Sequence, residues 1–362
     1  MKTLVLAGGF GTRLRPLSCT RPKALFPIAN KPLIDFVLEY LKSHGVETVV
    51  MGVYYMAEDI VRYLGPTKNG LGILYSREQR PMGTGGPVRK ALDLLNEETF
   101  TVMNGDIITD FDMGELVRRH KKFGGVATVA LTRVENPHIY GSVVLGEDGL
   151  IKRFVEKPEY GKAPSNLVNA GIYVFEPEIV DYIPEDGKTR IETQAFPVLV
   201  EEGQLYGFEN QCFWLDVGSP EDYLRANHHV LTRMGGNHQC ESAQVASTAK
   251  LVEPCIIGEG VSVGEDSQVG PNVSLGDGVS IGKGCLVENS ILFPGAVVED
   301  YSSVKGAILG ENCVIEKWVK VEEGSLIGDF AQIASGVTVT RGVSICPSKF
   351  IEESILEPRK VM

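Results

Sequence analysis

The first 34 residues contain no aspartate or glutamate, although the 362-residue chain carries a formal net charge of −12. Basic residues occupy this stretch instead: Arg13, Arg15, Arg21, Lys23 and Lys31. An acidic chain repels nucleic acid and anionic membrane surfaces, so we expect neither as a partner. An anionic substrate would depend on this local concentration of positive charge.

Long apolar runs are also absent, which excludes a membrane-spanning helix. Met1-Lys2 leads directly into a strand pattern without a signal-peptide pattern, so we expect a cytoplasmic protein. The seven cysteines are widely spread and show neither Cys-x-x-Cys spacing nor a neighbouring histidine. This excludes a zinc site of the usual spacing, and we expect reduced thiols.

A glycine-rich turn follows the first apolar strand pattern, and it runs Leu6-Ala7-Gly8-Gly9-Phe10-Gly11-Thr12-Arg13. Glycines allow backbone amides to approach phosphate oxygens without interference from a Cβ atom. The dinucleotide pattern GxGxxG lacks its third glycine here, and no Gly-Lys-Ser/Thr follows for a Walker loop. A simple tight connection remains the alternative to a phosphate-binding loop.

Strand-like and helical patterns alternate up to about residue 232, which predicts a doubly wound, mainly parallel α/β sheet. The expected strands are Thr3 to Leu6, Thr48 to Val53, Gly72 to Tyr75, Thr101 to Met103 and Val126 to Leu131. The expected helices are Leu33 to Ser43, Ala57 to Leu64, Pro87 to Leu95 and Met113 to Lys122. Ligands of such sheets bind beyond the carboxyl ends of the strands, where the Gly8-Gly9 loop would lie.

A period of six residues replaces this pattern from about residue 245. Apolar residues recur at 245, 251, 257, 263, 269, 275, 281, 287 and 293, and again at 309, 315, 321, 327, 333, 339 and 345. Each unit can form one short strand of a prism, with its apolar residue inside. We therefore expect domains at residues 1–232 and 245–362, a linker at 233–244, and a loop or skipped corner between 293 and 309.

Two aspartates follow strand patterns and are candidates for a metal site. Asp106 ends the motif Asn104-Gly105-Asp106, and Asp216 lies in Trp214-Leu215-Asp216-Val217-Gly218. Two carboxylates suit a Mg²⁺ ion that takes its remaining ligands from water and phosphate. A helix N-cap or a turn would explain either aspartate alone.

The strings Gly-Gly-Phe-Gly-Thr-Arg-Leu-Arg-Pro-Leu (8–17) and Arg-Pro-Lys-Ala-Leu-Phe-Pro-Ile-Ala-Asn-Lys-Pro (21–32) resemble the signature of the sugar nucleotidylyltransferases. Glu156-Lys157-Pro158, Tyr140-Gly141 and Asn169-Ala170-Gly171 match further motifs of this family, in family order. The hexads resemble the left-handed parallel β-helix. The resemblance covers essentially the whole chain and implies transfer of a nucleotidyl group from an NTP to a sugar 1-phosphate.

The resemblance assigns a role to each group of site residues. Arg13, Lys23, Asp106, Lys157 and Asp216 are implied as catalytic, with Asp106 and Asp216 holding Mg²⁺. The implied nucleotide-binding residues are Leu6, Ala7, Gly8, Gly9, Gly11, Thr12, Arg13, Lys23, Glu78, Gly83, Thr84 and Asn104. The implied sugar-phosphate-binding residues are Gly141, Glu156, Lys157, Asn169 and Gly171.

The segment Met82-Gly83-Thr84-Gly85-Gly86-Pro87 resembles a nucleotide-binding motif of this family. Its Gly-Pro ending, together with the tail from Pro347 to Met362, looks most like the GDP-mannose pyrophosphorylases of this family. GTP and mannose 1-phosphate are therefore the expected substrates. The carboxylate of Glu78 can accept both donors on the pairing edge of guanine. Arg80 departs from the acidic residue usual in eukaryotic-type relatives, and glucose 1-phosphate with UTP, dTTP or ATP remains the alternative.

The sequence agrees less well with two other function classes. A regulatory homologue that only senses nucleotide-sugar typically loses a metal ligand or a phosphate-binding base, whereas this chain keeps them all. An acyltransferase activity of the repeats would need an imidazole base, and all six histidines precede residue 239. We therefore expect the repeat domain to serve self-association.

Overall fold

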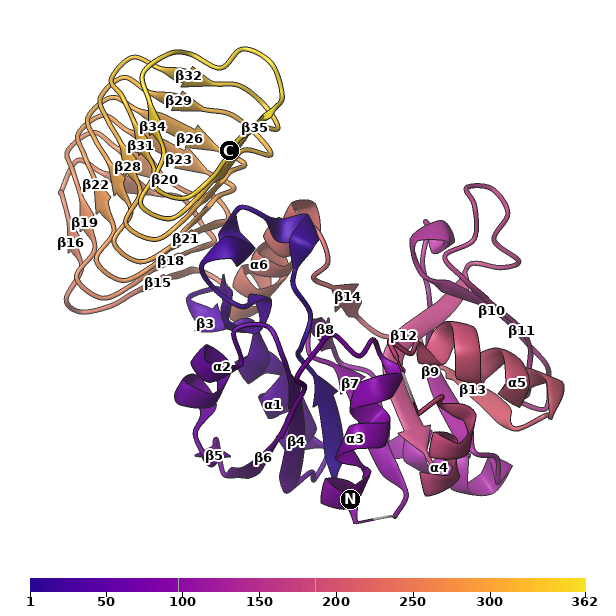
Figure 1. The fold of residues 1–362 in the computed structure, drawn as a ribbon. Coiled ribbons are helices and arrows are strands. Elements are labelled where there is room, and N and C mark those ends of the chain that lie inside the picture. Colours follow the sequence, from indigo (N-terminus) through magenta and orange to yellow (C-terminus); the bar gives the residue numbers. More distant parts are fainter. Residues whose placement is uncertain (97, 186) are drawn as a thin grey trace. The chain divides into compact units, whose positions relative to one another are not determined.

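The computed structural model describes residues 1–96, 98–185 and 187–362. It divides into two compact units, each formed from two segments of the chain. We call residues 1–9 and 34–216 the sheet unit, and residues 10–33 and 217–362 the repeat unit. Figure 1 shows the fold. In the described part of the chain no helix is long and apolar enough to span a membrane.

The sheet unit is built on a ten-stranded mixed sheet with the order β11-β10-β12-β7-β1-β4-β6-β5, in which β9 pairs with β12 and β13. The strands are β1 (Thr3–Leu6), β4 (Thr48–Val53), β5 (Thr67–Lys68), β6 (Leu71–Arg77), β7 (Phe100–Asn104), β9 (Ala127–Arg133), β10 (Gly141–Leu145), β11 (Ile151–Glu156), β12 (Leu167–Phe175) and β13 (Leu205–Glu209). A separate two-stranded ribbon joins β8 (Ile107–Thr109) and β14 (Trp214–Asp216).

Helices pack on this sheet because each carries an apolar face. They are α1 (Leu33–Ser43), α2 (Ala57–Leu64), α3 (Gly85–Leu95), α4 (Met113–Phe123) and α5 (Phe196–Glu201). The sequence places α3 two residues late, at Pro87, but Gly85 and Gly86 are already helical. Proline is tolerated in a first helical turn, where its missing N–H has no helical acceptor.

The predicted doubly wound α/β sheet is confirmed. Strands β1, β4 and β6 add in one direction along the sheet, and β7 then pairs with the opposite side of β1. The parallel register aligns Leu6 with Asn104, so the carboxyl ends of β1 and β7 lie side by side. Open α/β sheets bind ligands at such a reversal of strand order.

The repeat unit contains α6 (Pro220–Met234), the hairpin β2 (Pro27–Ile28) and β3 (Lys31–Pro32), and a prism of three parallel sheets. This is the architecture of the predicted left-handed β-helix. The first sheet has β15 (Asn237–Gln239), β18 (Cys255–Ile257), β21 (Val273–Leu275), β24 (Ile291–Leu292), β27 (Ile308–Leu309), β30 (Leu326–Ile327), β33 (Ser344–Ile345) and β35 (Lys360–Val361).

The second sheet has β16 (Gln244–Val245), β19 (Ser262–Val263), β22 (Ser280–Ile281), β25 (Val297–Val298), β28 (Val314–Ile315), β31 (Gln332–Ile333) and β34 (Phe350–Ile351). The third has β17 (Lys250–Leu251), β20 (Gln268–Val269), β23 (Leu286–Glu288), β26 (Ser303–Lys305), β29 (Lys320–Val321) and β32 (Thr338–Val339). One apolar core fills the prism, since the inward residues of all three sheets are buried together.

Strand β15 lies within residues 233–244, the range that the sequence pattern assigns to a linker, and it pairs with β18. Its residues Asn237–Gln239 are exposed and polar, so the apolar hexad signal is missing there. Backbone pairing with β18 brings this strand into the first sheet, together with a hydrogen bond from Cys255 Sγ to Oδ1 of Asn237 at 3.2 Å.

The expected loop between 293 and 309 is wrong, because the coils continue without interruption. Leu275 pairs with Leu292, and Leu292 pairs with Leu309, so both of these coils are one residue shorter than the coil from Ile257 to Leu275. Leu292, rather than Phe293, faces the prism core. Phe293 instead contacts Phe26 and Tyr223, with ring centroids 5.9 Å and 6.5 Å away.

Candidate active site

The two aspartates predicted to hold metal meet at one edge of the sheet unit. Asp106 directly precedes β8, and Asp216 ends β14. These strands pair antiparallel with Asp216 opposite Ile107, the residue after Asp106. The ribbon extends beyond the carboxyl end of β7, so both carboxylates lie near the reversal of strand order.

Gly171 and Asn104 lie against each other at this same edge. Strand β12 runs antiparallel to β7 with Ile172 opposite Met103. Gly171 has a φ of +70°, and a Cβ atom there would lie 2.5 Å from Nδ2 of Asn104. Only glycine fits this approach, so the backbone of β12 passes close to the motif that carries Asp106.

Gly8 and Gly9 of the first nucleotide motif differ in how closely their neighbours approach. A Cβ atom on Gly8 would lie 2.9 Å from Oε1 of Glu78, whereas one on Gly9 would have no neighbour within 4 Å. Leu6 ends β1, and the N–H of Ala7 donates to the oxygen of Gly52 at 2.9 Å. The loop is thus fixed on its sheet side and open at Gly9.

Glu78 connects the β1 loop with the segment that opens α3. Its Oε2 accepts a hydrogen bond from the N–H of Met82 at 3.0 Å, and its Oε1 lies near Gly8. Burial raises the pKa of this carboxyl above its ordinary value, and the Met82 N–H opposes the shift. Gly83, with φ +79°, would place a Cβ atom 2.0 Å from the oxygen of Thr189.

Glu156 and Lys157 adjoin Gly141 at the end of β11. Nζ of Lys157 lies 3.8 Å from Oε1 of Glu156, and a Cβ atom on Gly141 would lie 2.9 Å from Oε2. Lys157 has a φ of +44°, which is uncommon outside glycine and asparagine. Strained backbone of this kind occurs frequently at functional sites, where it directs a side chain.

Asn169 and Tyr173 form a polar pair on β12. Nδ2 of Asn169 donates to the hydroxyl of Tyr173 at 2.9 Å, and Oδ1 accepts from the N–H of Gly171 at 2.8 Å. Burial raises the pKa of Tyr173, and the carboxylates of Glu192, Glu156 and Asp106 raise it further. The charges of these three carboxylates therefore all act on one buried phenol.

Glu192 is a further candidate site residue, which sequence reasoning missed. It lies on a short π-helix, Ile191–Ala195, and its Oε2 accepts a hydrogen bond from Thr84 Oγ1 at 2.6 Å. Burial is the main cause that raises the pKa of Glu156, and the charge of Glu192 raises it further. Glu192 thus joins the predicted nucleotide residue Thr84 to the predicted sugar residue Glu156. A π-helix is often functional, but no sequence motif marks this one.

The remaining predicted residues, Gly11, Thr12, Arg13 and Lys23, belong to the repeat unit rather than the sheet unit. Thr12–Leu14 and Lys23–Leu25 are 3₁₀ turns, and Gly11 before the first has a φ of +59°. A Cβ atom on Gly218 would lie 2.6 Å from Nη2 of Arg13. The Arg13 guanidinium is therefore held beside Gly218, two residues after Asp216.

Arg21, counted among the basic residues of the first segment, has a structural partner in the repeat unit. Its Nη2 donates to Oε2 of Glu311, and its guanidinium carbon lies 5.2 Å from the ring centroid of Phe293. The Arg21 guanidinium therefore contacts two residues of the β-helix.

The donor set at the sheet edge fits Mg²⁺. Within residues 1–96, 98–185 and 187–362 no group of three or more His, Cys, Asp or Glu could hold a metal ion. Mg²⁺ commonly takes only one or two carboxylates and fills its octahedron with water and substrate phosphates. Asp106 and Asp216 supply two carboxylates, which suits an ion bound together with its nucleotide.

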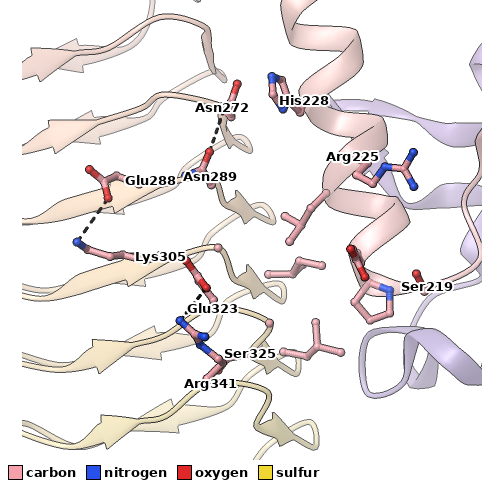
Figure 2. Close-up of a pocket in the computed structure, with 17 residues that line it drawn as sticks. Ser219, Arg225, His228, Asn272, Glu288, Asn289, Lys305, Glu323, Ser325 and Arg341 are labelled. Atoms are coloured by element: carbon pink, nitrogen blue, oxygen red, sulfur yellow. Dashed lines mark hydrogen bonds and ion pairs between the residues drawn. The ribbon is translucent and has the colours of Figure 1, made fainter.

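A separate cavity of about 720 Å³ lies in the repeat unit between α6 and the β-helix, as Figure 2 shows. Its lining comprises Ser219, Pro220, Glu221, Leu224, Arg225, His228, Asn272, Glu288, Asn289, Lys305, Gly306, Ile308, Glu323, Gly324, Ser325, Leu326 and Arg341. Lys305 pairs with Glu288 at 3.5 Å and Arg341 with Glu323 at 3.0 Å. The described lining includes none of the predicted site residues.

Two family models match consecutive parts of the chain. The Nucleotidyl transferase family matches residues 2–233, and the GMPPB C-terminal domain matches residues 251–361. The catalytic subunit beta of mannose-1-phosphate guanylyltransferase from Dictyostelium discoideum is 40% identical over 366 residues. The corresponding subunit from Danio rerio is 39% identical over 370 residues. Each alignment covers 100% of both chains.

Solved structures resemble a part of the chain. A putative glucose-1-phosphate thymidylyltransferase from Bacillus anthracis aligns with a TM-score of 0.58 and 25% identity, covering 63% of this chain and 94% of its own. HddC from Yersinia pseudotuberculosis, complexed with GMP-PN, aligns with a TM-score of 0.54 and 27% identity, covering 63% and 99%. The chain belongs to the nucleotidyl transferase family, with the GMPPB C-terminal domain as its β-helix.

Proposed function

We propose that this protein is a Mg²⁺-dependent mannose-1-phosphate guanylyltransferase, which joins GTP and mannose 1-phosphate into GDP-mannose and releases pyrophosphate. The observation that carries the proposal is the full-length similarity, at 35–40% identity, to proteins with that name. The carboxylates of Asp106 and Asp216 at the strand ends of the sheet unit, and Arg13 and Lys23 of residues 10–33, here called the basic loop, would supply the groups that such a transfer needs.

The attacking oxygen belongs to a phosphate that is already anionic, so the reaction needs no strong general base. Catalysis then consists mainly of alignment and charge neutralisation. Lys157 would hold the phosphate of the sugar, and Arg13 and Lys23 would neutralise the triphosphate. Glu156 and Asn169 would bind sugar hydroxyls, since together they offer acceptors and a donor.

Asp106 and Asp216 would hold Mg²⁺, which supplies neutralisation of phosphate charge and orientation of the triphosphate when bound. Gly8 lies close to Glu78, whereas the space beside Gly9 is open and leaves room for a phosphate. Glu78 would accept the donors of guanine through Oε1 and the remaining lone pair of Oε2, because Met82 occupies the other.

The test is a matrix of GTP, UTP, dTTP and ATP against mannose 1-phosphate and glucose 1-phosphate, with Mg²⁺ and pyrophosphate release as the readout. The proposal expects the highest kcat/KM for GTP with mannose 1-phosphate. A higher value for a glucose 1-phosphate pair would overturn the proposed specificity and would match the activity named for the Bacillus anthracis protein. Binding of GDP-mannose without pyrophosphate release would identify a regulatory homologue instead.

Self-association through the β-helix is part of the same proposal. Exposed aromatic residues on the prism include Tyr301, Trp318 and Phe330. Tyr301 and Trp318 stack with ring centroids 4.4 Å apart. Light scattering on the purified chain would show an oligomer if this part is correct, and a monomer at all concentrations if it is not.

A further inference from the structure

The basic loop and the β-helix belong to one compact unit, although the loop carries two of the residues proposed to bind the triphosphate. Residues 10–33 group with residues 217–362 and not with the sheet from which they emerge. Segments separated by about 300 positions in the sequence are therefore packed together. The contacts between them show how the loop is held.

The first contact is an ion pair between Arg21, which lies two residues before Lys23, and Glu311 of the β-helix. Both side chains are partly buried, with 21% and 34% of their surface exposed, so water screens the pair less than it screens a surface pair. The Arg21 guanidinium also lies over the buried ring of Phe293. A planar guanidinium that makes both contacts has one orientation.

The second contact uses a carboxylate that the β-helix buries. Asp329 is 4% exposed, and its Oδ1 accepts a hydrogen bond from the N–H of Glu311 at 2.8 Å. Its Oδ2 accepts from the hydroxyl of Thr20 at 2.7 Å. Asp277 occupies the same corner position in an earlier coil and bonds Glu259 in the same way, yet it is exposed. The loop therefore accounts for the burial of Asp329.

Further contacts fix the carboxyl-terminal part of the loop. Nδ2 of Asn30 donates to the oxygen of Leu275 at 2.7 Å, and the N–H of Ala29 donates to Oδ1 of Asn227 at 2.8 Å. The same Oδ1 accepts from Ser274 of the β-helix at 2.8 Å. Asn227, which is 1% exposed, thus joins the loop, α6 and the prism.

We propose that the β-helix is a positioning element for nucleotide binding, in which Glu311 and Asp329 hold Arg21 and Thr20 so that Lys23 and Arg13 meet the triphosphate. Arg21, Thr20, Glu311 and Asp329 act through the loop and do not touch substrate. This inference rests on the proposed function, and it adds a role for the repeat domain beyond self-association.

The test compares Arg21→Met and Glu311→Gln with the wild type, using separate titrations of GTP and mannose 1-phosphate. The expected result is a kcat/KM for GTP that is lower by about 10- to 10²-fold, because small misplacements of a binding group have effects of that size. The KM for mannose 1-phosphate and the melting temperature should stay within twofold and within a few degrees of the wild type.

Glu259→Ala is the matched control, since Glu259 occupies the corner position equivalent to Glu311 and is exposed. It should leave both titrations unchanged. The exchange Arg21→Glu with Glu311→Arg should recover part of the loss, as expected for a direct pair in a double-mutant cycle. Equal kcat/KM for GTP in the wild type, Arg21→Met and Glu311→Gln would overturn the inference.

The outcome is separable from that of the proposed function. If the wild type prefers another NTP, the same comparison is made with that NTP, and the inference is judged on it. If the wild type releases no pyrophosphate, equilibrium binding of Mg²⁺-GTP to the same variants replaces turnover. Unchanged affinity in both variants would then overturn the inference.

Discussion

The sheet edge and the basic loop supply opposite charges and are held by different means. Asp106, Asp216 and Glu156 stand at or beside strand ends of the sheet unit, where backbone pairing fixes them. Arg13 and Lys23 stand on 3₁₀ turns without such pairing, and side chains of the β-helix hold their segment. Asp106, Asp216 and Glu156 therefore depend on the sheet, whereas Arg13 and Lys23 depend on the repeats.

Loss of either carboxylate proposed to hold Mg²⁺ tests the sheet edge and should have the largest effect. Asp106→Asn and Asp216→Asn keep the side-chain volume but remove the charge that would hold Mg²⁺. We expect kcat to fall about 10³-fold, with a higher Mg²⁺ requirement in titrations. Asp148→Asn, in an exposed turn, is the control. Wild-type turnover in both site variants would contradict the proposed binding of Mg²⁺ by these two aspartates.

Loss of one cation on each side should separate the two substrates. Lys23→Met should lower kcat/KM for GTP about 10²-fold, because an electrostatic partner of the triphosphate is gone. Lys157→Met should act mainly through the KM for mannose 1-phosphate. Steady-state titrations of each substrate measure the difference, and Lys162→Met, which is exposed, serves as the control. The same pattern in both variants would contradict the assignment of separate roles.

Glu156→Gln should have the smallest effect on activity. It should weaken the binding of mannose 1-phosphate and make the folded protein more stable. Burial, then the neighbouring Glu192, raises the folded-state pKa of Glu156. The unfolded carboxyl ionises near pH 4.3, so the folded state holds its proton to higher pH and loses stability as the pH rises through this window. Glutamine removes that loss. We therefore expect a small rise in melting temperature at pH 7.5.

The same comparison at about pH 4 should show no difference, because both states of the wild type are then largely protonated. The KM for mannose 1-phosphate should rise about tenfold at pH 7.5, since a charged hydrogen-bond acceptor is lost. Thermal melts across this range measure the effect. A variant that is less stable than the wild type at pH 7.5 would show that the ion pair with Lys157 outweighs burial.

Local sequence patterns predicted part of the sheet unit accurately because their signals are short-range. The strands Thr3–Leu6 and Thr48–Val53 and the helices Leu33–Ser43 and Ala57–Leu64 agree with the structure at both ends. Apolar periodicity and flanking glycines are sufficient for such elements. The pairing of Asp216 with the Asp106 turn could be expected only through the family resemblance, because it joins residues 110 positions apart.

Contacts without a motif were beyond prediction. Glu192 on a π-helix bonds Thr84. Leu292 instead of Phe293 faces the prism core, because two coils are one residue shorter than the others before them. Neither feature changes the local residue pattern. The role of Arg21 was also hidden, because a basic residue beside a phosphate motif suggests phosphate until Glu311 is seen beside it.

By itself the sequence determined the α/β sheet, the hexad prism and the family, since each depends on repeated local patterns that survive without knowledge of neighbours. The tertiary structure alone decided that residues 10–33 belong with the β-helix and that Asp329 is buried beneath Thr20. Such assignments depend on the desolvation and pairing of single polar groups from distant segments. Only packing brings those groups together.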